Sequence, residues 1–277
     1  MAVDTTASGS AVGTAGSARA ASFADQSIAL ARRAVLRTVR QRGLVIFPMV
    51  FPLILFAING SALSPATRIP GFPTDNYRDF LIAMPFIQGA MFVSITAGVD
   101  LARDIESGFL NRLAMTPLRG EALLVGQLGG ALVVGVIQAV IYLLFGLATG
   151  VTLVSGVGGA LVLLALSILI SFAFASLGEF LALRFGTGEA VQGIFPLLFV
   201  TLFLSSSSLP RNLIKASWFR EVATYNPISY LLEGLRSLVI TGWDARALAL
   251  GFGFAIALLV ISLGLSRSAM KTRLARR

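Results

Sequence analysis

The sequence predicts an all-α membrane protein with six transmembrane helices, and composition gives the first reason. Of the 277 residues, 56% are hydrophobic and only 13% are charged, and the mean hydropathy is +0.85. Soluble domains contain about 25% charged residues, and their surfaces need more polar side chains than this chain supplies. The second reason is a set of six hydrophobic stretches, each close to the ~20 residues that cross ~30 Å of hydrocarbon.

Missing residue types exclude several kinds of chemistry. The chain has no Cys and no His, which excludes disulfides, thiolate or imidazole metal sites and Ser-His or Cys-His catalysis. Its two lysines, Lys215 and Lys271, do not follow a glycine-rich turn, so we expect no phosphate-binding P-loop. The hydrophobic stretches carry no paired carboxylates and no Ser-x-x-Lys arrangement. We therefore expect that the chain is not an enzyme.

The N-terminal region divides into two parts before the membrane domain. Residues 1–22 are mostly Ala, Ser, Gly and Thr, a composition typical of a disordered tail. Residues 23–42 predict an interfacial amphipathic helix, although an ordinary solvated basic helix is the alternative. Its apolar and basic faces are expected to carry, respectively, Ile28, Ala31, Val35 and Val39, and Arg33, Arg37 and Arg40. The membrane domain is then 43–270, followed by a basic tail at 271–277.

The six expected spans have boundaries that are soft by several residues. They are 43–63, 80–99, 122–149, 156–183, 190–209 and 245–266. Prolines are expected to kink three of the spans at Pro48, Pro52, Pro85 and Pro196. Small residues spaced by four in the third span indicate close helix packing, at the pairs Gly126 with Gly130 and Gly146 with Gly150.

The distribution of basic residues predicts the orientation. With both termini in the cytoplasm, 15 of the 22 Lys and Arg residues lie on the inner side and seven on the outer side. This asymmetry follows the positive-inside rule. The net charge of +9 therefore indicates membrane orientation rather than nucleic-acid binding, because the basic residues border hydrophobic segments and form no continuous soluble face.

The inner loop at 100–121 is strongly charged and joins the second and third spans. Asp100 and Asp104 are one helical turn apart, so the second helix is expected to continue out of the membrane here. Gly108 permits a break, and Pro117 sets a second boundary. A short helix at 109–115 would then lie across the membrane surface. The alternative is a solvated loop that only obeys the positive-inside rule.

The outer stretch between the fifth and sixth spans predicts a re-entrant helical hairpin at 210–240. Four serines at 205–208 end the fifth span, and Asn226-Pro227 is a signal to stop one helix and start another. The two expected helices are too short or too polar to cross the membrane, and aromatic residues suit its interface. Those residues are Trp218, Tyr225, Tyr230 and Trp243. An ordinary outer loop is the alternative.

Few polar side chains lie within the spans. Glu179 is near the inner end of the fourth span, and Gln88 and Gln138 are uncharged. A proton-coupled carrier usually needs carboxylates or His near the membrane centre. We expect Glu179 to extend toward the inner interface, which leaves an ion-coupled carrier as the less favoured interpretation.

These two loops resemble the membrane subunits of ABC-2 type transporters, most closely the daunorubicin/doxorubicin-resistance efflux permeases. The inner-loop resemblance consists of Glu106-x-Gly108, Arg112-Leu113 and Thr116-Pro117-Leu118. The outer resemblance runs from Phe195-Pro196 through the four serines, Pro210, Trp218, the sequence Tyr225-Asn226-Pro227-Ile228-Ser229-Tyr230, Glu233 and Arg236. The order and spacing match over about residues 25–270. Each short motif is only moderately specific. The order of these motifs along a six-span chain is much more specific.

The resemblance implies a type V ABC exporter arrangement. Two permease subunits would dock on two copies of an ABC ATPase subunit that binds ATP and Mg²⁺, while this chain carries no cofactor or metal. We expect the two permeases to form a homodimer, and pairing with a related permease is the alternative. The resemblance places a cytoplasmic coupling helix in the inner loop, with ATPase-coupling residues at Asp104, Glu106, Gly108, Arg112, Leu113 and Pro117. It places an outer gate at Ser205, Ser206, Tyr225, Asn226, Pro227, Tyr230 and Glu233. Candidate residues of the translocation path are Gln88, Gln138 and Pro196.

The expected function is that of a multi-pass permease in a bacterial cell membrane. It would export a hydrophobic drug or lipid-like compound, with ATP hydrolysed by the separate subunit. Two alternatives stay open. One is export of a polysaccharide or lipid-linked glycan, and the other is an ion-coupled secondary transporter that depends on Glu179.

Overall fold

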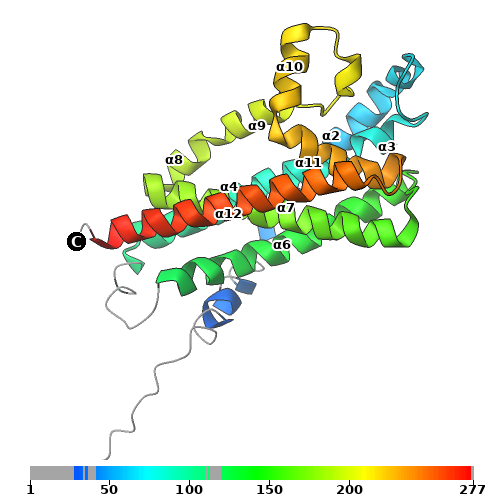
Figure 1. Ribbon diagram of the computed structural model, residues 1–277. Coiled ribbons are helices and arrows are strands. Elements are labelled where there is room, and N and C mark those ends of the chain that lie inside the picture. The colour runs from blue at the N-terminus through cyan, green and yellow to red at the C-terminus, as the bar shows by residue number, and fades with distance from the viewer. Residues whose placement is uncertain (1–27, 34, 37–41, 110–111, 113–119, 276–277) are drawn as a thin grey trace, which may run out of the picture.

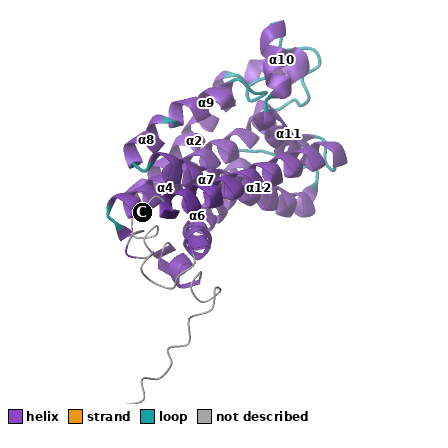
Figure 2. Cartoon of the chain, turned by 60° about the vertical axis from the view of Figure 1, so that its left-hand side comes forward, coloured by secondary structure: helices purple, strands orange, loops and turns teal. Residues whose placement is uncertain are grey.

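The computed structural model describes residues 28–33, 35–36, 42–109, 112 and 120–275, and none of these residues forms a strand. The described chain is a bundle of long helices joined by turns and short 3-10 helices (Figures 1 and 2). The elements are α2 (Arg42–Ala62), η1 (Ser64–Arg68), α3 (Tyr77–Leu81), α4 (Ala83–Glu106), α6 (Gly120–Ala148), α7 (Gly156–Phe185), α8 (Gly188–Gly193), α9 (Phe195–Phe203), η2 (Arg211–Leu213), α10 (Ser217–Tyr225), α11 (Pro227–Ile240) and α12 (Ala245–Ala275). The all-α prediction is confirmed for the described residues.

Four helical segments are long and apolar enough to cross a membrane. They are Tyr77–Glu106, Leu124–Ala148, Gly156–Phe185 and Ala245–Arg273, and they correspond to the second, third, fourth and sixth predicted spans. The first and fifth predicted spans correspond to shorter apolar helices at Ile46–Ala62 and Gly188–Phe203. The bundle has two ends (Figure 1). We call the end with α3, α10 and the start of α12 the hairpin end, and the end with residues 100–109, α8 and the end of α12 the loop end.

Two of the predicted proline interruptions are present. The α3 helix ends at Leu81, four residues before Pro85, as expected because a proline ring clashes with the carbonyl four residues earlier. The fifth predicted span is divided into α8 and α9 at Ile194, and Pro196 lies in the first turn of α9, where its missing N–H is tolerated. In contrast, α2 continues as one helix through Pro48 and Pro52.

The central seam of the bundle lies between α4 and α7, where two glycines bring the backbones together. A Cβ atom on Gly178 would lie 1.8 Å from the carbonyl oxygen of Ser94, and a Cβ on Gly98 would lie 2.7 Å from the carbonyl oxygen of Gly178. Real Cβ atoms do not approach a backbone oxygen so closely. The seam therefore requires glycine at both positions, as in other closely packed membrane helices.

The segment 28–36 packs against α6 with a face that includes Ala31, but not Ile28, of the predicted apolar face. A Cβ atom added to Gly126 would lie 2.4 Å from the Cβ of Leu30, and one added to Gly129 would lie 2.7 Å from the Cβ of Ala31. The close packing predicted at Gly126 is therefore confirmed. Ile28, which was expected on the apolar face, is 66% exposed. The predicted apolar face is therefore correct at Ala31 and wrong at Ile28, because packing partners, as well as helical period, decide which side chains are covered.

Gly146 packs against Ile82, whose Cδ1 atom would lie 2.6 Å from an added Cβ, so its prediction as a packing residue is also confirmed. Gly150 is not a packing residue, because it has a φ of +90° in the turn after α6 and nothing would lie within 4 Å of its Cβ. A turn, and not a helix contact, explains this glycine.

Candidate functional site

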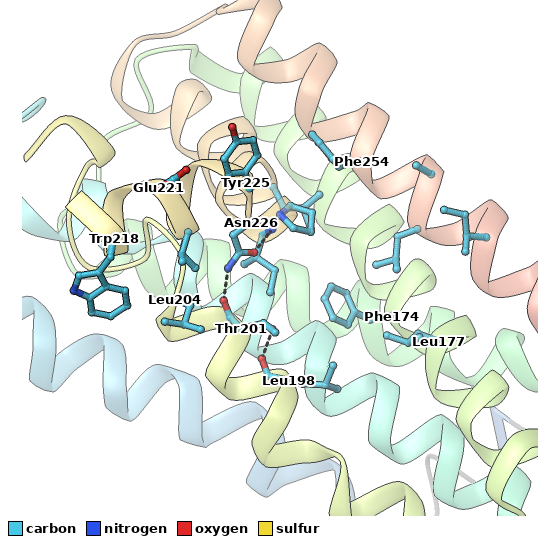
Figure 3. A pocket seen from close by; sticks show the side chains of 17 residues that line it. Phe174, Leu177, Leu198, Thr201, Leu204, Trp218, Glu221, Tyr225, Asn226 and Phe254 are labelled. Atoms are coloured by element: carbon cyan, nitrogen blue, oxygen red, sulfur yellow. Dashed lines mark hydrogen bonds between the residues drawn. The ribbon is translucent and has the colours of Figure 1, made fainter. Parts of the chain in front are cut away.

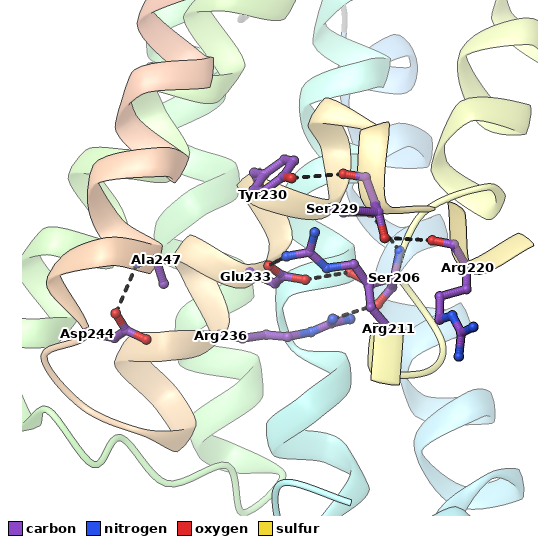
Figure 4. Close-up of polar contacts among 10 residues, drawn as sticks. Ser206, Arg211, Arg220, Ser229, Tyr230, Glu233, Arg236, Asp244 and Ala247 are labelled. Carbon is purple, nitrogen blue, oxygen red and sulfur yellow. Dashed lines mark hydrogen bonds and ion pairs between the residues drawn. The ribbon is translucent and has the colours of Figure 1, made fainter. Parts of the chain in front are cut away.

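Arg236 of α11 organises the hairpin end by binding three backbone carbonyl groups. Figure 4 shows Arg236 beside Ser206, which supplies one of them. Its Nε atom donates to the oxygen of Phe80 at 2.7 Å, and its two terminal nitrogens donate to the oxygens of Ser206 and Ser207 at 2.6 Å each. The side chain is buried, and the guanidinium lies 3.6 Å from the ring centroid of Phe80. Arg236 thus fixes the serine run 205–208 against α3 and α11.

A second charged group of α11, Glu233, continues this network. Its carboxylate accepts a hydrogen bond from Ser206 at 3.3 Å and forms an ion pair with Arg211. The guanidinium of Arg211 lies 4.7 Å from the ring centroid of Tyr230, whose hydroxyl donates to the oxygen of Thr224 at 2.9 Å. Burial lowers the pKa of Arg211, but Tyr230 and Glu233 together raise it by more, so its net pKa lies above the ordinary value.

The stop and restart predicted at Asn226-Pro227 is confirmed. The Oδ1 atom of Asn226 accepts from the amide of Ile228 at 2.9 Å, which makes Asn226 the N-cap of α11, and Pro227 occupies the first helical position. Both residue types suit these positions. The side-chain Nδ2 of Asn226 also donates to the backbone oxygen of Thr201 in α9 at 2.6 Å. One side chain therefore sets the angle between α10 and α11 and ties both to α9.

The other predicted gate residues divide into two sets. Ser205 and Ser206 are buried, and Ser206 joins the network around Arg236 and Glu233. Tyr225 is instead 79% exposed. It lines an apolar groove of about 950 Å³ between α7, α9, α10, α11 and α12 (Figure 3), together with Trp218, Glu221, Phe174 and Phe254.

At the loop end, Asp104 is buried and bonded within the chain. Its carboxylate accepts from the amide of Gln127 at 2.7 Å and pairs with Arg33 at 3.4 Å. The guanidinium of Arg33 in turn lies 4.0 Å from the ring centroid of Phe109. Asp104 therefore holds the segment 28–36 against α4 and α6.

Glu106 is exposed and links α4 to α8, because its Oε1 atom accepts from the amide of Gly188 at 3.0 Å. The break predicted at Gly108 is confirmed, since α4 ends at Glu106 and Gly108 has a φ of +68°. Arg112 is exposed. Leu113 and Pro117, and most of the predicted surface helix at 109–115, lie outside the described residues.

The polar residues predicted within the spans are enclosed by the bundle. Gln88 and Gln138 are buried, and amide atoms of both have no hydrogen-bond partner among the described residues. Glu179 is also completely buried, so the prediction that it extends to the interface is wrong, because α4 and α6 pack over the face of α7 that carries it. Pro196 is exposed at the start of α9.

Sequence reasoning missed a row of six phenylalanines that connects α2, α4 and α9. Successive ring centroids are 4.6–6.3 Å apart. The row consists of Phe47, Phe51, Phe92, Phe195, Phe199 and Phe203. A signal was present, since the residues of α2 and of α9 are each spaced by four and so share one helix face. We call this feature the phenylalanine row.

The contact between Glu106 and Gly188 makes a testable prediction. Gly188→Pro removes the donor N–H at a first helical position that accepts proline, so we expect a loss of about 1 kcal/mol in the free energy of unfolding, as for Glu106→Ala. Gly188→Ala is the matched control, because its Cβ would make only ordinary contact, 3.6 Å from Val99. Thermal unfolding of the two single variants and their double variant checks this. Losses that simply add would show that the two residues do not interact.

An all-helical bundle whose described residues include four helices long and apolar enough to cross a membrane defines the class of a membrane protein. The family described as ABC-2 type transporter matches residues 25–240, so the chain belongs to that family.

Its relatives include a daunorubicin resistance ABC transporter permease protein of Streptomyces coeruleorubidus, which is 25% identical over 71% of this chain and 67% of the relative. A probable doxorubicin resistance ABC transporter permease protein of Mycobacterium tuberculosis is 21% identical over 79% of both chains. A putative transport permease of Cyanophora paradoxa is 26% identical over 78% of this chain and 74% of the relative. The chain is thus an ABC-2 permease of an ABC transporter.

Proposed function

We propose that this chain is the transmembrane subunit of an ATP-driven exporter that moves a hydrophobic drug or lipid-like compound out of a bacterial cell. Membership of the ABC-2 family, together with relatives named for daunorubicin and doxorubicin resistance, supports ATP-driven drug export. The observation that carries the substrate class is the phenylalanine row, because a continuous aromatic surface favours apolar and aromatic solutes.

We place six spans in the bilayer by adding two spans, α2 and the pair of α8 with α9, to the four long helices. The 21 residues of α2 extend about 31 Å, enough for the hydrocarbon core. The helices α8 and α9 with the serine run form the fifth span. Both termini are then cytoplasmic by the positive-inside rule, so the hairpin end is outside, and α10 and α11 form the re-entrant hairpin.

We assign the energy supply to partner subunits at the loop end. Two copies of an ABC ATPase would bind ATP and Mg²⁺, and a second copy of this chain would complete a homodimer in the bilayer. Exposed Glu106 and Arg112 are available to contact the ATPase, whereas Asp104 acts by holding the segment 28–36. Because Glu106 is bonded to the start of α8, movement of the loop 100–121 would shift α4 and the fifth span together.

We assign the outer gate to the network of Arg236, Glu233, Ser206 and Asn226. It joins α3, the end of the fifth span, and α11 by hydrogen bonds to backbone carbonyls, so these elements would move as one body. Gln88 lies one helical turn from Phe92, which places a polar group beside the phenylalanine row. A glycan exporter would need many hydrogen-bonding groups along this path, and a row made only of phenylalanine disfavours that alternative.

The proposal is tested by transport in sealed inside-out vesicles that contain the permease and its ATPase. Daunorubicin is the probe, since its own fluorescence reports uptake. We expect ATP-dependent, vanadate-sensitive uptake that is absent without the permease. ATP hydrolysis by the complete complex without uptake of daunorubicin or of a fluorescent lipid would contradict the assigned substrate class.

Phe92→Ala is expected to reduce daunorubicin uptake about tenfold, because Phe92 connects the rings of α2 with those of α9. Loss of aromatic contacts in a binding surface costs about 0.5–1.5 kcal/mol beyond the lost area. Phe185→Ala is the control, since Phe185 is half-exposed on α7 and lies outside the row. Equal uptake by the two variants, at equal amounts of protein in the membrane, would show that the phenylalanine row does not line the translocation path.

A further inference from the structure

Glu179 is a buried carboxyl group that the proposed transport mechanism does not use. It lies in α7, is 0% exposed, and neither of its oxygens has a hydrogen-bond partner among the described residues. An unpaired carboxylate enclosed in protein is strongly disfavoured, whereas the neutral acid is far better tolerated there. Such residues inside membrane domains are functional candidates.

The surroundings of Glu179 are defined by its neighbours along α7. Ala175 and Ala182 lie four and three residues away, so they share its helix face, and both are completely buried. Ala175 packs in a cluster with Val93 of α4 and Leu128 of α6, and Ala182 in a cluster with Leu101 of α4 and Leu124 of α6. Glu179 therefore faces the junction of α4, α6 and α7, and Met270 of α12 and Val191 of α8 belong to the same buried cluster as Ala182.

Further polar groups without partners lie beside this junction. The hydroxyls of Ser94 in α4 and Ser176 in α7 are buried and have no hydrogen-bond partner among the described residues. Ser94 is the residue whose backbone touches Gly178, next to Glu179. The Ser94 hydroxyl would hydrogen-bond to water as soon as the α4–α7 seam opened, whereas Ser176 lies toward α12, where its carbonyl oxygen accepts from Ser266.

No described ion pair compensates the carboxyl. The charged residues of the elements packed around it are Arg32 and Arg33 of the segment 28–36, Asp100, Arg103, Asp104 and Glu106 of α4, Arg184 of α7, Glu189 of α8, and Arg246, Arg267, Lys271 and Arg273 of α12. Among the side chains of α6 that the structure describes, Tyr142 is the only one that can titrate. Most of these charges belong to the loop end, and Arg246 is at the other end of α12.

We propose that Glu179 is a proton-binding site whose occupancy is linked to packing of the α4–α7 seam. A proton is the ligand that an enclosed carboxyl binds without displacing its neighbours. While the seam is closed, the acid keeps its proton. When the seam opens and water enters, the O–H bond breaks, the electron pair stays on the carboxylate and the proton passes to water. This linkage goes beyond ATP-driven export, because it belongs to the permease alone.

The first test asks whether the proton is present. Infrared spectra of the full chain in lipid nanodiscs at neutral pH are compared with those of Glu179→Gln, which has nearly the same shape. The difference spectrum is expected to contain the C=O stretching band of a protonated carboxyl in the unsubstituted chain. Glu179→Met provides the same comparison if the Gln variant does not fold. A difference spectrum without that band would overturn the proposal.

The second test asks whether proton release accompanies opening. Because the chain has no cysteine, Ser94→Cys places a single thiol at the seam, and N-ethylmaleimide reports when it becomes accessible. The alkylation rate is measured from about pH 6 to about pH 9 for Ser94→Cys alone and for Ser94→Cys combined with Glu179→Gln. The first rate is divided by the second, which cancels the titration of the thiol. We expect this ratio to rise several-fold with pH. A constant ratio would overturn the linkage. Neither test uses transport, so failure here is distinct from failure of the proposed function.

Discussion

Gly178→Ala is expected to destabilise the chain by about 3 kcal/mol, the upper range for overpacking a core. The added methyl would lie 1.8 Å from the carbonyl oxygen of Ser94, and backbone atoms cannot turn aside as a flexible side chain can. The α4 and α7 helices would have to separate along the whole seam. Thermal unfolding in detergent, followed by the fraction that stays monodisperse on size-exclusion chromatography, measures the effect.

Gly264→Ala is the matched control for this variant. Gly264 is also a helical glycine, in α12, but nothing would lie within 4 Å of its Cβ. Alanine is the better helix former by about 1 kcal/mol, so this variant is expected to unfold at the same temperature or slightly higher. If Gly178→Ala were as stable as Gly264→Ala, the close packing of α4 on α7 would be incorrect.

Arg236→Met is expected to have a similarly large effect, a loss of about 3–5 kcal/mol, which is the range for breaking a buried charged network. Methionine fills the volume but leaves the carbonyl oxygens of Phe80, Ser206 and Ser207 without their donor. Arg236→Lys keeps the charge, but an ammonium group lacks the planar fork that reaches three acceptors. We therefore expect Lys to recover only part of the loss.

Thermal unfolding of the Arg236 variants is compared with that of Arg220→Met. Arg220 is exposed on α10, so removing its charge is expected to change stability by less than about 0.5 kcal/mol. Full stability of Arg236→Lys would show that charge alone, and not the fork of hydrogen bonds, holds the hairpin end together.

Features set by local conformation could be predicted from the sequence. Asn226-Pro227 ends one helix and caps the next, and Gly108 adopts a positive φ at the end of α4. In both cases the residue type restricts its own backbone or that of its nearest neighbours. The phenylalanine row was also accessible in part, because spacing by four is a local signal.

Features that depend on distant partners could not be predicted. The carbonyl groups bound by Arg236 are 29 to 156 residues away in the chain, and Gly178 meets Ser94 only because α4 and α7 cross at that point. Glu179 was expected to reach the interface, because its position near a span end suggested it. The neighbours that enclose it belong to other helices, and no pattern within α7 specifies them.

The central claim is that this permease works with a separate ATPase, and affinity purification tests it most directly. The chain is expressed with its native genomic neighbours, purified in mild detergent, and its companions are identified by mass spectrometry. We predict a soluble subunit with a P-loop, in equal amount to the permease, with ATPase activity that falls on Glu106→Ala. A chain that purifies alone and still moves solutes in liposomes under an ion gradient would contradict the account.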